Sequence, residues 1–362
     1  MNKRLLEIFL NLVTIDGTSA RERNIANFII SFLRKLNLSP YEDSCAKASN
    51  GNSGNIICPI GDGGNFILLS HMDTARPTIN LKPQILEDRI TSDGTTILGA
   101  DNRAGIACLL YSLEKLIIQN IPIKDFTLVF TIQEETTLNG SRFLELNGKY
   151  KMGFVFDSHA KPGNFIYESA GSIGFKEKLF GKASHSGLAP ELGIDAIKIA
   201  ANAISKIQLG RIDDETTANI GFIKGGEANN VVPAYVEIEG EVRSMNPNKL
   251  EEKINEIKDI FEFEANSLGG RSEFESFWNF KPYKVSQESE TYKTIQKAIL
   301  KAGLVPIPII SKGGSDANSI NAKGIPCVNL GIGAENPHSN DEYILFESLE
   351  STSRIAEELM VR

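Results

Sequence analysis

The sequence has few of the residues that mark extracellular or membrane proteins. Its 362 residues include only four cysteines, and no apolar run approaches the roughly 20 residues that a membrane-spanning helix needs. The cysteines lie far apart, without the spacing of a zinc site or a redox motif, so we expect reduced thiols in a cytoplasmic protein. The 38 basic residues are outnumbered by 46 acidic ones, for a formal net charge of −8. This balance argues against nucleic acid or a membrane as the main partner, because both bind a basic face.

Hydrophobic patterning predicts two domains, in line with a chain length at which a single core usually stops growing. Residues 1–168 and 281–362 alternate buried strand-like runs, such as NFILLS, with helical runs, such as RAGIACLLYSLEKLIIQ. This alternation is typical of an α/β domain whose mostly parallel sheet is flanked by helices. Residues 169–280 follow the order β-α-β-β-α-β, and their strands alternate polar and apolar residues. We therefore predict a ferredoxin-like domain inserted into a discontinuous α/β domain.

Several strand-like runs of the α/β domain end in acidic residues or histidine. These run-ending residues are His71, Asp73, Glu134, Glu135 and Asp157. The carboxyl ends of parallel strands lie along one sheet edge, where ligands bind in this class of fold. Asp101, in LGADNRAG, and His338, in AENPHSND, are expected to join them from loops. Each residue alone has an ordinary explanation, such as a helix N-cap for Asp101, but the joint pattern favours a metal site.

The residue types indicate which chemistry such a site would support. Imidazole together with carboxylate is a ligand set of zinc, manganese or cobalt, whereas calcium takes oxygen ligands alone. If the strand continues, His71 and Asp73 face the same side, and Asp73 can accept the proton of the imidazole nitrogen that is not bound to metal. Glu134 and Glu135 are adjacent and should point to opposite sides, so one could bind metal while the other transfers a proton. The remaining candidate, His159, is expected on the surface.

As a set, the motifs SHMDTA, LGADNRAG, QEE, FDS, HSG, NNVVP, GGSDAN and PHSNDE resemble those of M20-type metallopeptidases with two zinc ions, particularly the peptidase T (tripeptidase) branch. The resemblance covers essentially the whole chain and implies a zinc-peptidase-like catalytic domain with two Zn²⁺ ions per subunit, for which Co²⁺ or Mn²⁺ could substitute. It implies Glu134 as general base and Asp73 as the residue that orients His71. The implied ligands are His71, Asp101 and Asp157 for one ion, and Asp101, Glu135 and His338 for the other.

The resemblance also implies a cytoplasmic aminopeptidase that hydrolyses short peptides with a water activated between the two zinc ions. The inserted domain would be a lid that forms a homodimer, and His185 of the HSG motif would reach its own or a neighbouring active site to hold the substrate carbonyl. Asn230, Arg243 and Lys312 are further implied substrate contacts. Two features depart from the family: relatives tend to have arginine in place of Lys312, and the chain is shorter than peptidase T itself.

Two alternatives stay open. An amidohydrolase of the same scaffold, such as a deacylase or carboxypeptidase, would share every metal ligand and differ only in pockets formed by the inserted domain. A non-catalytic binding protein could keep the fold, but the intact set of histidines and carboxylates argues against this.

Overall fold

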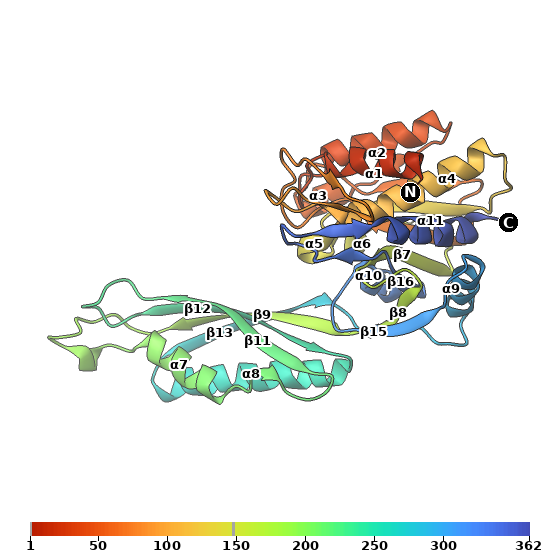
Figure 1. Ribbon diagram of the computed structural model, residues 1–362. Helices are drawn as coiled ribbons and strands as arrows, with labels where there is room; N and C mark the ends of the chain where they lie inside the picture. The colour runs from red at the N-terminus through yellow and green to blue at the C-terminus, as the bar shows by residue number, and fades with distance from the viewer. Residues whose placement is uncertain (1, 147–148) are drawn as a thin grey trace. The chain divides into compact units, whose positions relative to one another are not determined.

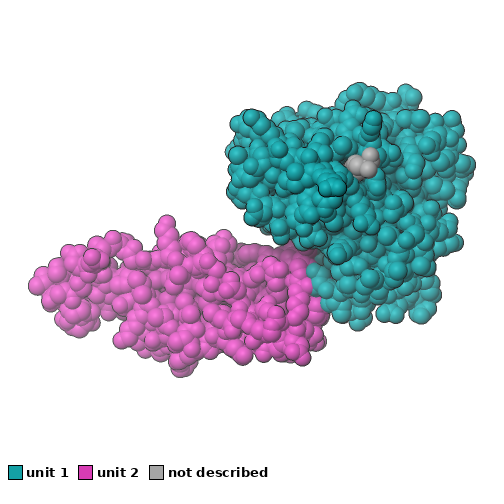
Figure 2. Space-filling view, in the orientation of Figure 1, with its two compact units in different colours: residues 1–168, 284–311, 315–362 teal, residues 169–283, 312–314 magenta. Residues whose placement is uncertain are grey.

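The computed structural model describes residues 2–146 and 149–362 and divides into two compact units (Figure 2). The first unit comprises the residues up to Glu168, Lys284–Ser311 and Ser315–Arg362, and the second comprises Ser169–Tyr283 and Lys312–Gly314. The sequence-based boundary is wrong for residues 281–283 and 312–314, which it places in the first unit. The second of these segments belongs to the second unit because Ser169 Oγ donates to the carbonyl of Gly313 (2.7 Å) and Arg243 donates to the carbonyl of Lys312 (3.5 Å).

The first unit contains a nine-stranded mixed sheet. Its four central strands, β6, β3, β7 and β16, are parallel to one another, whereas the strands that flank them pair in antiparallel fashion. The strands in order are β1 (Tyr41–Glu42), β2 (Ile56–Ile60), β6 (Phe126–Thr131), β3 (Phe66–His71), β7 (Met152–Ser158), β16 (Cys327–Gly331), β8 (Asn164–Ser169) and β14 (Tyr283–Lys284), with β15 (Ile307–Ser311) paired to β8. The parallel strands are the uninterrupted apolar runs of the sequence, because both of their faces are buried.

Helices cover both faces of this sheet. Figure 1 shows α1, α2 and α4 on one side and α9 and α10 on the other. The helices of the unit are α1 (Lys3–Val13), α2 (Arg23–Lys35), α3 (Cys45–Ser49), α4 (Ala100–Ile118), α5 (Glu134–Thr137), α6 (Asn139–Phe143), α9 (Glu290–Lys301), α10 (Asp316–Ala322) and α11 (Phe346–Met360). A small sheet in the order β17 (Ala334–Glu335), β18 (Tyr343–Leu345), β5 (Arg89–Thr91) and β4 (Gln84–Ile85) completes the unit.

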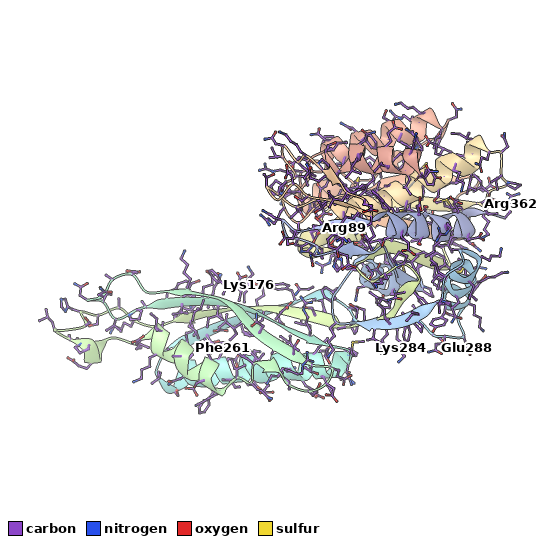
Figure 3. All side chains as sticks on the ribbon, viewed as in Figure 1. Arg89, Lys176, Phe261, Lys284, Glu288 and Arg362 are labelled. Atoms are coloured by element: carbon purple, nitrogen blue, oxygen red, sulfur yellow. The ribbon has the colours of Figure 1, made fainter. Side chains whose placement is uncertain are left out.

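The second unit is a five-stranded antiparallel sheet with helices on one face. Along the chain its elements are β9 (Gly171–Phe180), the 3₁₀ helix η1 (Pro190–Leu192), α7 (Ala196–Lys206), β10 (Gly210–Arg211), β11 (Thr217–Gly225), β12 (Tyr235–Ser244), α8 (Pro247–Ser267) and β13 (Arg271–Phe280). Apart from η1 and β10, this is the predicted β-α-β-β-α-β order. Phe261 of α8 is buried in the core under the sheet, whereas Lys176 lies on the open face and pairs with Glu239 at 2.8 Å (Figure 3).

All four cysteines lie in the described part of the chain, and each is free and buried. This agrees with the prediction of reduced thiols. Among residues 2–146 and 149–362, no helix combines the length and apolar character needed to cross a bilayer.

Candidate metal centre and active site

The predicted ligands converge at the carboxyl ends of the central parallel strands. His71 is the last residue of β3, and Asp157 lies one residue before the end of the neighbouring strand β7. Asp101 lies in the first turn of α4. All three side chains are buried, and His71 Nε2 lies 3.2 Å from Asp101 Oδ1 and 3.0 Å from Asp157 Oδ1. One imidazole nitrogen therefore faces two carboxylates.

A second histidine repeats this arrangement on the other side of Asp101. His338 Nε2 lies 3.3 Å from Asp101 Oδ2 and 3.0 Å from Glu135 Oε2. Asp101 thus presents one oxygen to each histidine, as a carboxylate shared by two cations would. Ligand atoms of His71, Asp101 and Glu135 all lie within 4.8 Å of one another. The structure therefore brings together all five predicted metal ligands.

Asp73 connects this cluster to the two glutamates. His71 Nδ1, the imidazole nitrogen that faces away from Asp101, lies 3.1 Å from the backbone carbonyl oxygen of Asp73 and 3.3 Å from Asp73 Oδ1. The same carboxylate accepts hydrogen bonds from Ser19 Oγ (2.6 Å) and from the backbone N–H groups of Glu134 (3.0 Å) and Glu135 (3.1 Å). The expected contact with His71 is present, although β3 ends at His71 and the contact does not depend on a continuing strand.

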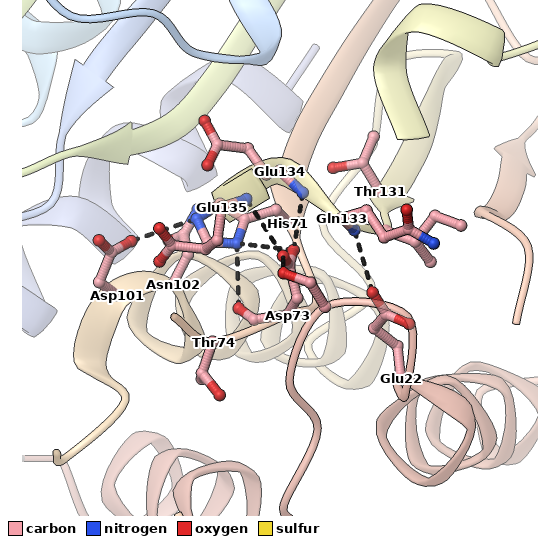
Figure 4. Close-up of polar contacts among 12 residues, drawn as sticks. Glu22, His71, Asp73, Thr74, Asp101, Asn102, Thr131, Gln133, Glu134 and Glu135 are labelled. Carbon is pink, nitrogen blue, oxygen red and sulfur yellow. Dashed lines mark hydrogen bonds and ion pairs between the residues drawn. The ribbon is translucent and has the colours of Figure 1, made fainter. Parts of the chain in front are cut away.

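The two glutamates lie on a helix and not on a strand. β6 ends at Thr131, Gln133 adopts a left-handed conformation with φ of 50°, and α5 begins at Glu134. The expectation of a strand-like arrangement with opposite side chains is wrong, because successive residues of a helix are rotated by about 100°. Their carboxylates nevertheless point in different directions, that of Glu135 toward Asp101 (Figure 4).

The electrostatics of the side chains favour cation binding. Burial lowers the pKa of His71, but the charge of Asp157 and the hydrogen bonds to Asp101 and Asp157 outweigh it, so the pKa is raised well above its usual range. Hydrogen bonds to Asp101 and Glu135 raise the pKa of His338 to about 10. Both imidazoles thus lie where a positive charge is strongly stabilised, which is the environment that a divalent cation needs.

Glu134 has a different environment from Glu135. Burial, followed by repulsion from Asp157, raises the pKa of the Glu134 carboxyl well above its usual range. Glu135 shares the upward shift from burial but is hydrogen-bonded to His338, which opposes it. A carboxylate with a raised pKa and no histidine partner is suited to accept a proton.

The four predicted substrate contacts all lie in the second unit, in two pairs. Arg243 donates to the carbonyl of Lys312, while its guanidinium pairs with Glu241 at 2.8 Å and lies over the Phe280 ring. Lys312 Nζ donates to the carbonyl of Asp214 (2.6 Å).

The other pair, His185 and Asn230, lies on neighbouring segments of the second unit. His185 forms an isolated β-bridge with Val231, and the N–H of Ser186 donates to the carbonyl of Asn230 (3.0 Å). His185 Nδ1 accepts the N–H groups of Gly187 and Leu188, both at 3.2 Å. The proton of the neutral imidazole is therefore on Nε2, which makes this nitrogen a donor.

Sequence reasoning missed several residues of the site. Glu342, the last residue of the PHSNDE motif, is buried and accepts the N–H groups of Gly99 (2.7 Å) and Asp101 (2.9 Å). His159 is exposed, as expected, but its Nδ1 lies 3.7 Å from Asp101 Oδ2. The position of Glu342 within a family motif and the two-residue separation of His159 from Asp157 were the available signals.

A further missed group lies behind Asp73. Glu22 is buried and accepts the backbone N–H of Gln133 (3.0 Å), and burial raises the pKa of its carboxyl to about 7. Arg103, from the LGADNRAG motif, is also buried, and its charge acts on both Asp73 and Glu22. Glu22 is followed by a helical run of ordinary composition, so no local pattern distinguished it from a helix-start residue.

Two family models match the chain. One, described as a peptidase dimerisation domain of the M20 type, matches residues 167–268. The other, described as M42 glutamyl aminopeptidase, matches residues 84–174. All but the first two residues of the first match lie in the second unit of the structure, whereas the second match covers part of the first unit and residues 169–174 of the second.

Relatives match over nearly the whole chain. The uncharacterised protein YqjE of Bacillus subtilis (strain 168) is 37% identical over 359 residues, covering 98% of this chain and 96% of that protein. Peptidase T of Alkaliphilus oremlandii (strain OhILAs) is 26% identical over 413 residues, covering 98% and 97%. Among solved structures, aminopeptidase PepT from Bacillus cereus ATCC 10987 is 36% identical with a TM-score of 0.89, and a tripeptidase from Staphylococcus aureus subsp. aureus Mu50 is 36% identical with a TM-score of 0.92. Each of these two comparisons covers 99% of this chain and 97% of the other.

Proposed function

The chain belongs to the M20 family of peptidases, among the relatives of peptidase T, and from this premise we propose that it is a metal-dependent aminopeptidase that removes the N-terminal residue from tripeptides and other short peptides. The observation that carries the proposal is the convergence of two imidazoles and the three carboxylates of Asp101, Glu135 and Asp157 at one sheet edge. The relatives called tripeptidase, PepT and peptidase T supply the substrate class.

The side chains present fit a pair of divalent cations. His71 and His338 each direct Nε2 at two carboxylate oxygens within 3.3 Å, and nitrogen with oxygen is the donor set of zinc, cobalt and manganese. The first ion would be held by His71, Asp101 and Asp157, and the second by Asp101, Glu135 and His338. Two Zn²⁺ ions bound there would polarise the scissile carbonyl and lower the pKa of the attacking water.

Glu134 serves as the general base in this proposal. Burial and repulsion from Asp157 raise the pKa of its carboxyl, which makes the carboxylate a stronger proton acceptor than an exposed glutamate. It takes a proton from the attacking water and returns it to the nitrogen of the leaving amine when the C–N bond breaks. Asp73 fixes the orientation of His71 and, through two backbone N–H groups, the position of both glutamates.

His185, Asn230, Arg243 and Lys312 are the proposed substrate contacts. His185 presents an Nε2–H donor, which suits a substrate carbonyl oxygen or the oxyanion formed from it. Asn230, Arg243 and Lys312 are proposed contacts for the rest of the peptide. One ammonium N–H of Lys312 donates to the carbonyl of Asp214, and the other two can pair with a peptide carboxylate, although without the bidentate geometry of arginine.

We place the homodimer contact on the outer edge of β11. β10 pairs with β11 only at Thr217 and Ala218, and beyond them the outer edge of this strand pairs with no other described strand. Phe222 and Ile223 lie on this stretch with 45% and 55% of their surface exposed. An open strand edge with apolar side chains is a template for pairing with a second copy. Location in the cytoplasm stays a prediction from the sequence.

A substrate panel tests the function. Purified protein reconstituted with Zn²⁺, Co²⁺ or Mn²⁺ should hydrolyse free tripeptides and release their first residue, and N-acetylation of the same tripeptides should abolish hydrolysis. Cleavage of N-acyl amino acids without cleavage of free tripeptides would assign a deacylase instead. Release of the last residue would assign a carboxypeptidase.

A further inference from the structure

The short segment that carries the two glutamates is held by two buried carboxylates from elsewhere in the chain. The backbone N–H of Gln133 donates to Glu22 Oε1 (3.0 Å), and the N–H groups of Glu134 and Glu135 donate to Asp73 at 3.0 and 3.1 Å (Figure 4). Three consecutive backbone N–H groups therefore donate to carboxylates. The left-handed conformation of Gln133, unusual for a residue with a side chain, is held by these contacts.

Glu22 is built for this contact. Its side chain is fully buried, 111 positions away from Gln133 in the chain. Oε1 accepts both the N–H of Gln133 and that of Ala20 (2.9 Å), another residue with positive φ. Oε2 has no hydrogen-bond partner among the described residues. The hydrogen bonds of the carboxylate are thus directed at two backbone turns, one of which leads directly into α5.

A buried cation compensates the two carboxylates. Arg103 is fully buried, and its positive charge acts on Asp73, Asp16 and Glu22. Its Nη2 lies 3.4 and 3.5 Å from the carbonyls of Ile15 and Gly17, whereas Nε and Nη1 have no partner within the described residues. The guanidinium therefore stabilises both anions mainly through its field and leaves the Glu22 oxygens available to the backbone.

We propose that Glu22 is a positioning residue for the reaction: by holding the amide of Gln133, it fixes the turn that aims the Glu134 carboxylate. Gln133 directly precedes Glu134, whereas Glu135 is one residue further along and also directs its carboxylate at His338, so we expect loss of the Glu22 contact to displace Glu134 more than the metal ligands. Proton transfer needs a well-placed base, and a displacement of about 1 Å can lower a rate by about 100-fold. The kinetic part of this inference rests on the proposed aminopeptidase function.

Three substitutions of Glu22 separate the effect of its side-chain length from the effect of its charge. Glu22→Ala removes the acceptor, Glu22→Asp keeps the charge but is one methylene shorter, and Glu22→Gln keeps a carbonyl oxygen at the position of Oε1. Leu33→Ala is the matched control, because Leu33, like Glu22, is fully buried and lies on α2, the helix that begins directly after Glu22. It should destabilise the fold through a cavity alone.

The measurements are kcat and KM for a tripeptide, metal content, and hydrogen–deuterium exchange of the Gln133–Glu135 amides. In Glu22→Ala and Glu22→Asp we expect kcat to fall by about tenfold or more, with KM within about threefold of the original protein, metal content unchanged, and faster exchange at Gln133. Glu22→Gln should stay within about threefold in kcat. Leu33→Ala should lower the melting temperature and leave kcat and the exchange at Gln133 unchanged.

The outcomes distinguish this inference from the function it rests on. An unchanged kcat or unchanged exchange at Gln133 in Glu22→Ala overturns the positioning role, as does an equal loss of kcat in Leu33→Ala. If the unsubstituted protein hydrolyses no peptide, the aminopeptidase proposal fails, while the exchange measurement still decides whether Glu22 holds the turn. Glu22→Asp carries the test if Glu22→Ala does not fold.

Discussion

Asp73→Asn replaces one oxygen of a carboxylate that faces four hydrogen-bond donors with an NH₂ group. Oδ1 receives the N–H of Glu134 and lies beside His71 Nδ1, and Oδ2 receives the hydroxyl of Ser19 and the N–H of Glu135. An asparagine amide has one acceptor oxygen, so its NH₂ group must face donors on one side in either orientation. At least one buried backbone N–H loses its partner, at a cost of about 1–3 kcal/mol.

The loss of charge adds to this cost and also affects metal binding. Hydrogen bonds to charged groups are worth about 1.5–3 kcal/mol each, so the unfolding free energy of the metal-free protein should fall by about 3 kcal/mol. Removing a hydrogen-bond partner of a ligating imidazole typically weakens metal affinity by about 10- to 100-fold. The backbone carbonyl of residue 73, 3.1 Å from His71 Nδ1, remains in Asp73→Asn, so we expect the lower end of this range, about tenfold or about 1.4 kcal/mol. The first effect is on the fold, and the second is on the His71 site.

Two assays separate these effects. Urea unfolding of the demetallated protein measures the first, and competition with a chromogenic chelator measures the second. Asp16→Asn is the matched control: Asp16 accepts the N–H of Thr78 (2.8 Å) and lies in the field of Arg103, but it does not contact His71. It should leave metal affinity unchanged. Metal binding by Asp73→Asn as tight as that of the original protein would refute the orienting role of Asp73.

Three further predictions follow from the same structure. Chelation of the bound metal should lower the melting temperature, and added Zn²⁺ should restore it, because the buried carboxylates repel one another without cations; an unchanged melting temperature on scanning calorimetry would show that metal does not stabilise the fold. Burial raises the pKa of Glu177 from 4.5 to about 7, so the folded protein loses stability relative to the unfolded chain as pH rises through this interval. In urea unfolding, Glu177→Gln should therefore stabilise the protein by up to about 3 kcal/mol at pH 8 but hardly at pH 4.5. Equal effects at both pH values would contradict this. Phe222→Glu combined with Ile223→Lys should convert the dimer to a monomer on sedimentation, whereas Phe277→Glu on the opposite edge strand should not; a dimer that survives the first change would move the contact elsewhere.

The parts of the fold with regular periodicity could be predicted from the sequence. Uninterrupted apolar runs identified the central parallel strands, because a strand buried on both faces is apolar at every position. Alternating polar and apolar residues identified the strands of the second unit, because these strands are buried on one face only. The candidate ligands were predicted from their joint pattern, because a single histidine or carboxylate at a strand end has an ordinary explanation, whereas several that meet at one sheet edge favour a metal site. The strands β8 and β15, which lie outside the parallel core of the sheet, have a weaker pattern and were not predicted.

Contacts between distant segments left no such signal. Nothing local shows that Glu22 accepts the amide of Gln133 or that Ser169 binds Gly313, since each contact is set by the packing of the whole unit. The helical conformation of Glu134 and Glu135 was missed because the preceding strand residues suggested a period of two. In each of these cases tertiary structure overrides the local pattern.

Turnover by Glu134→Ala at full metal loading tests the central claim most directly. General base catalysis contributes about 10²- to 10⁴-fold, so tripeptide hydrolysis should fall by this factor while metal content stays that of the original protein. Glu135→Ala is the matched control and should lose metal. Turnover that persists in Glu134→Ala would contradict the proposed mechanism, and loss of metal from this variant would show that the roles of the two glutamates are exchanged.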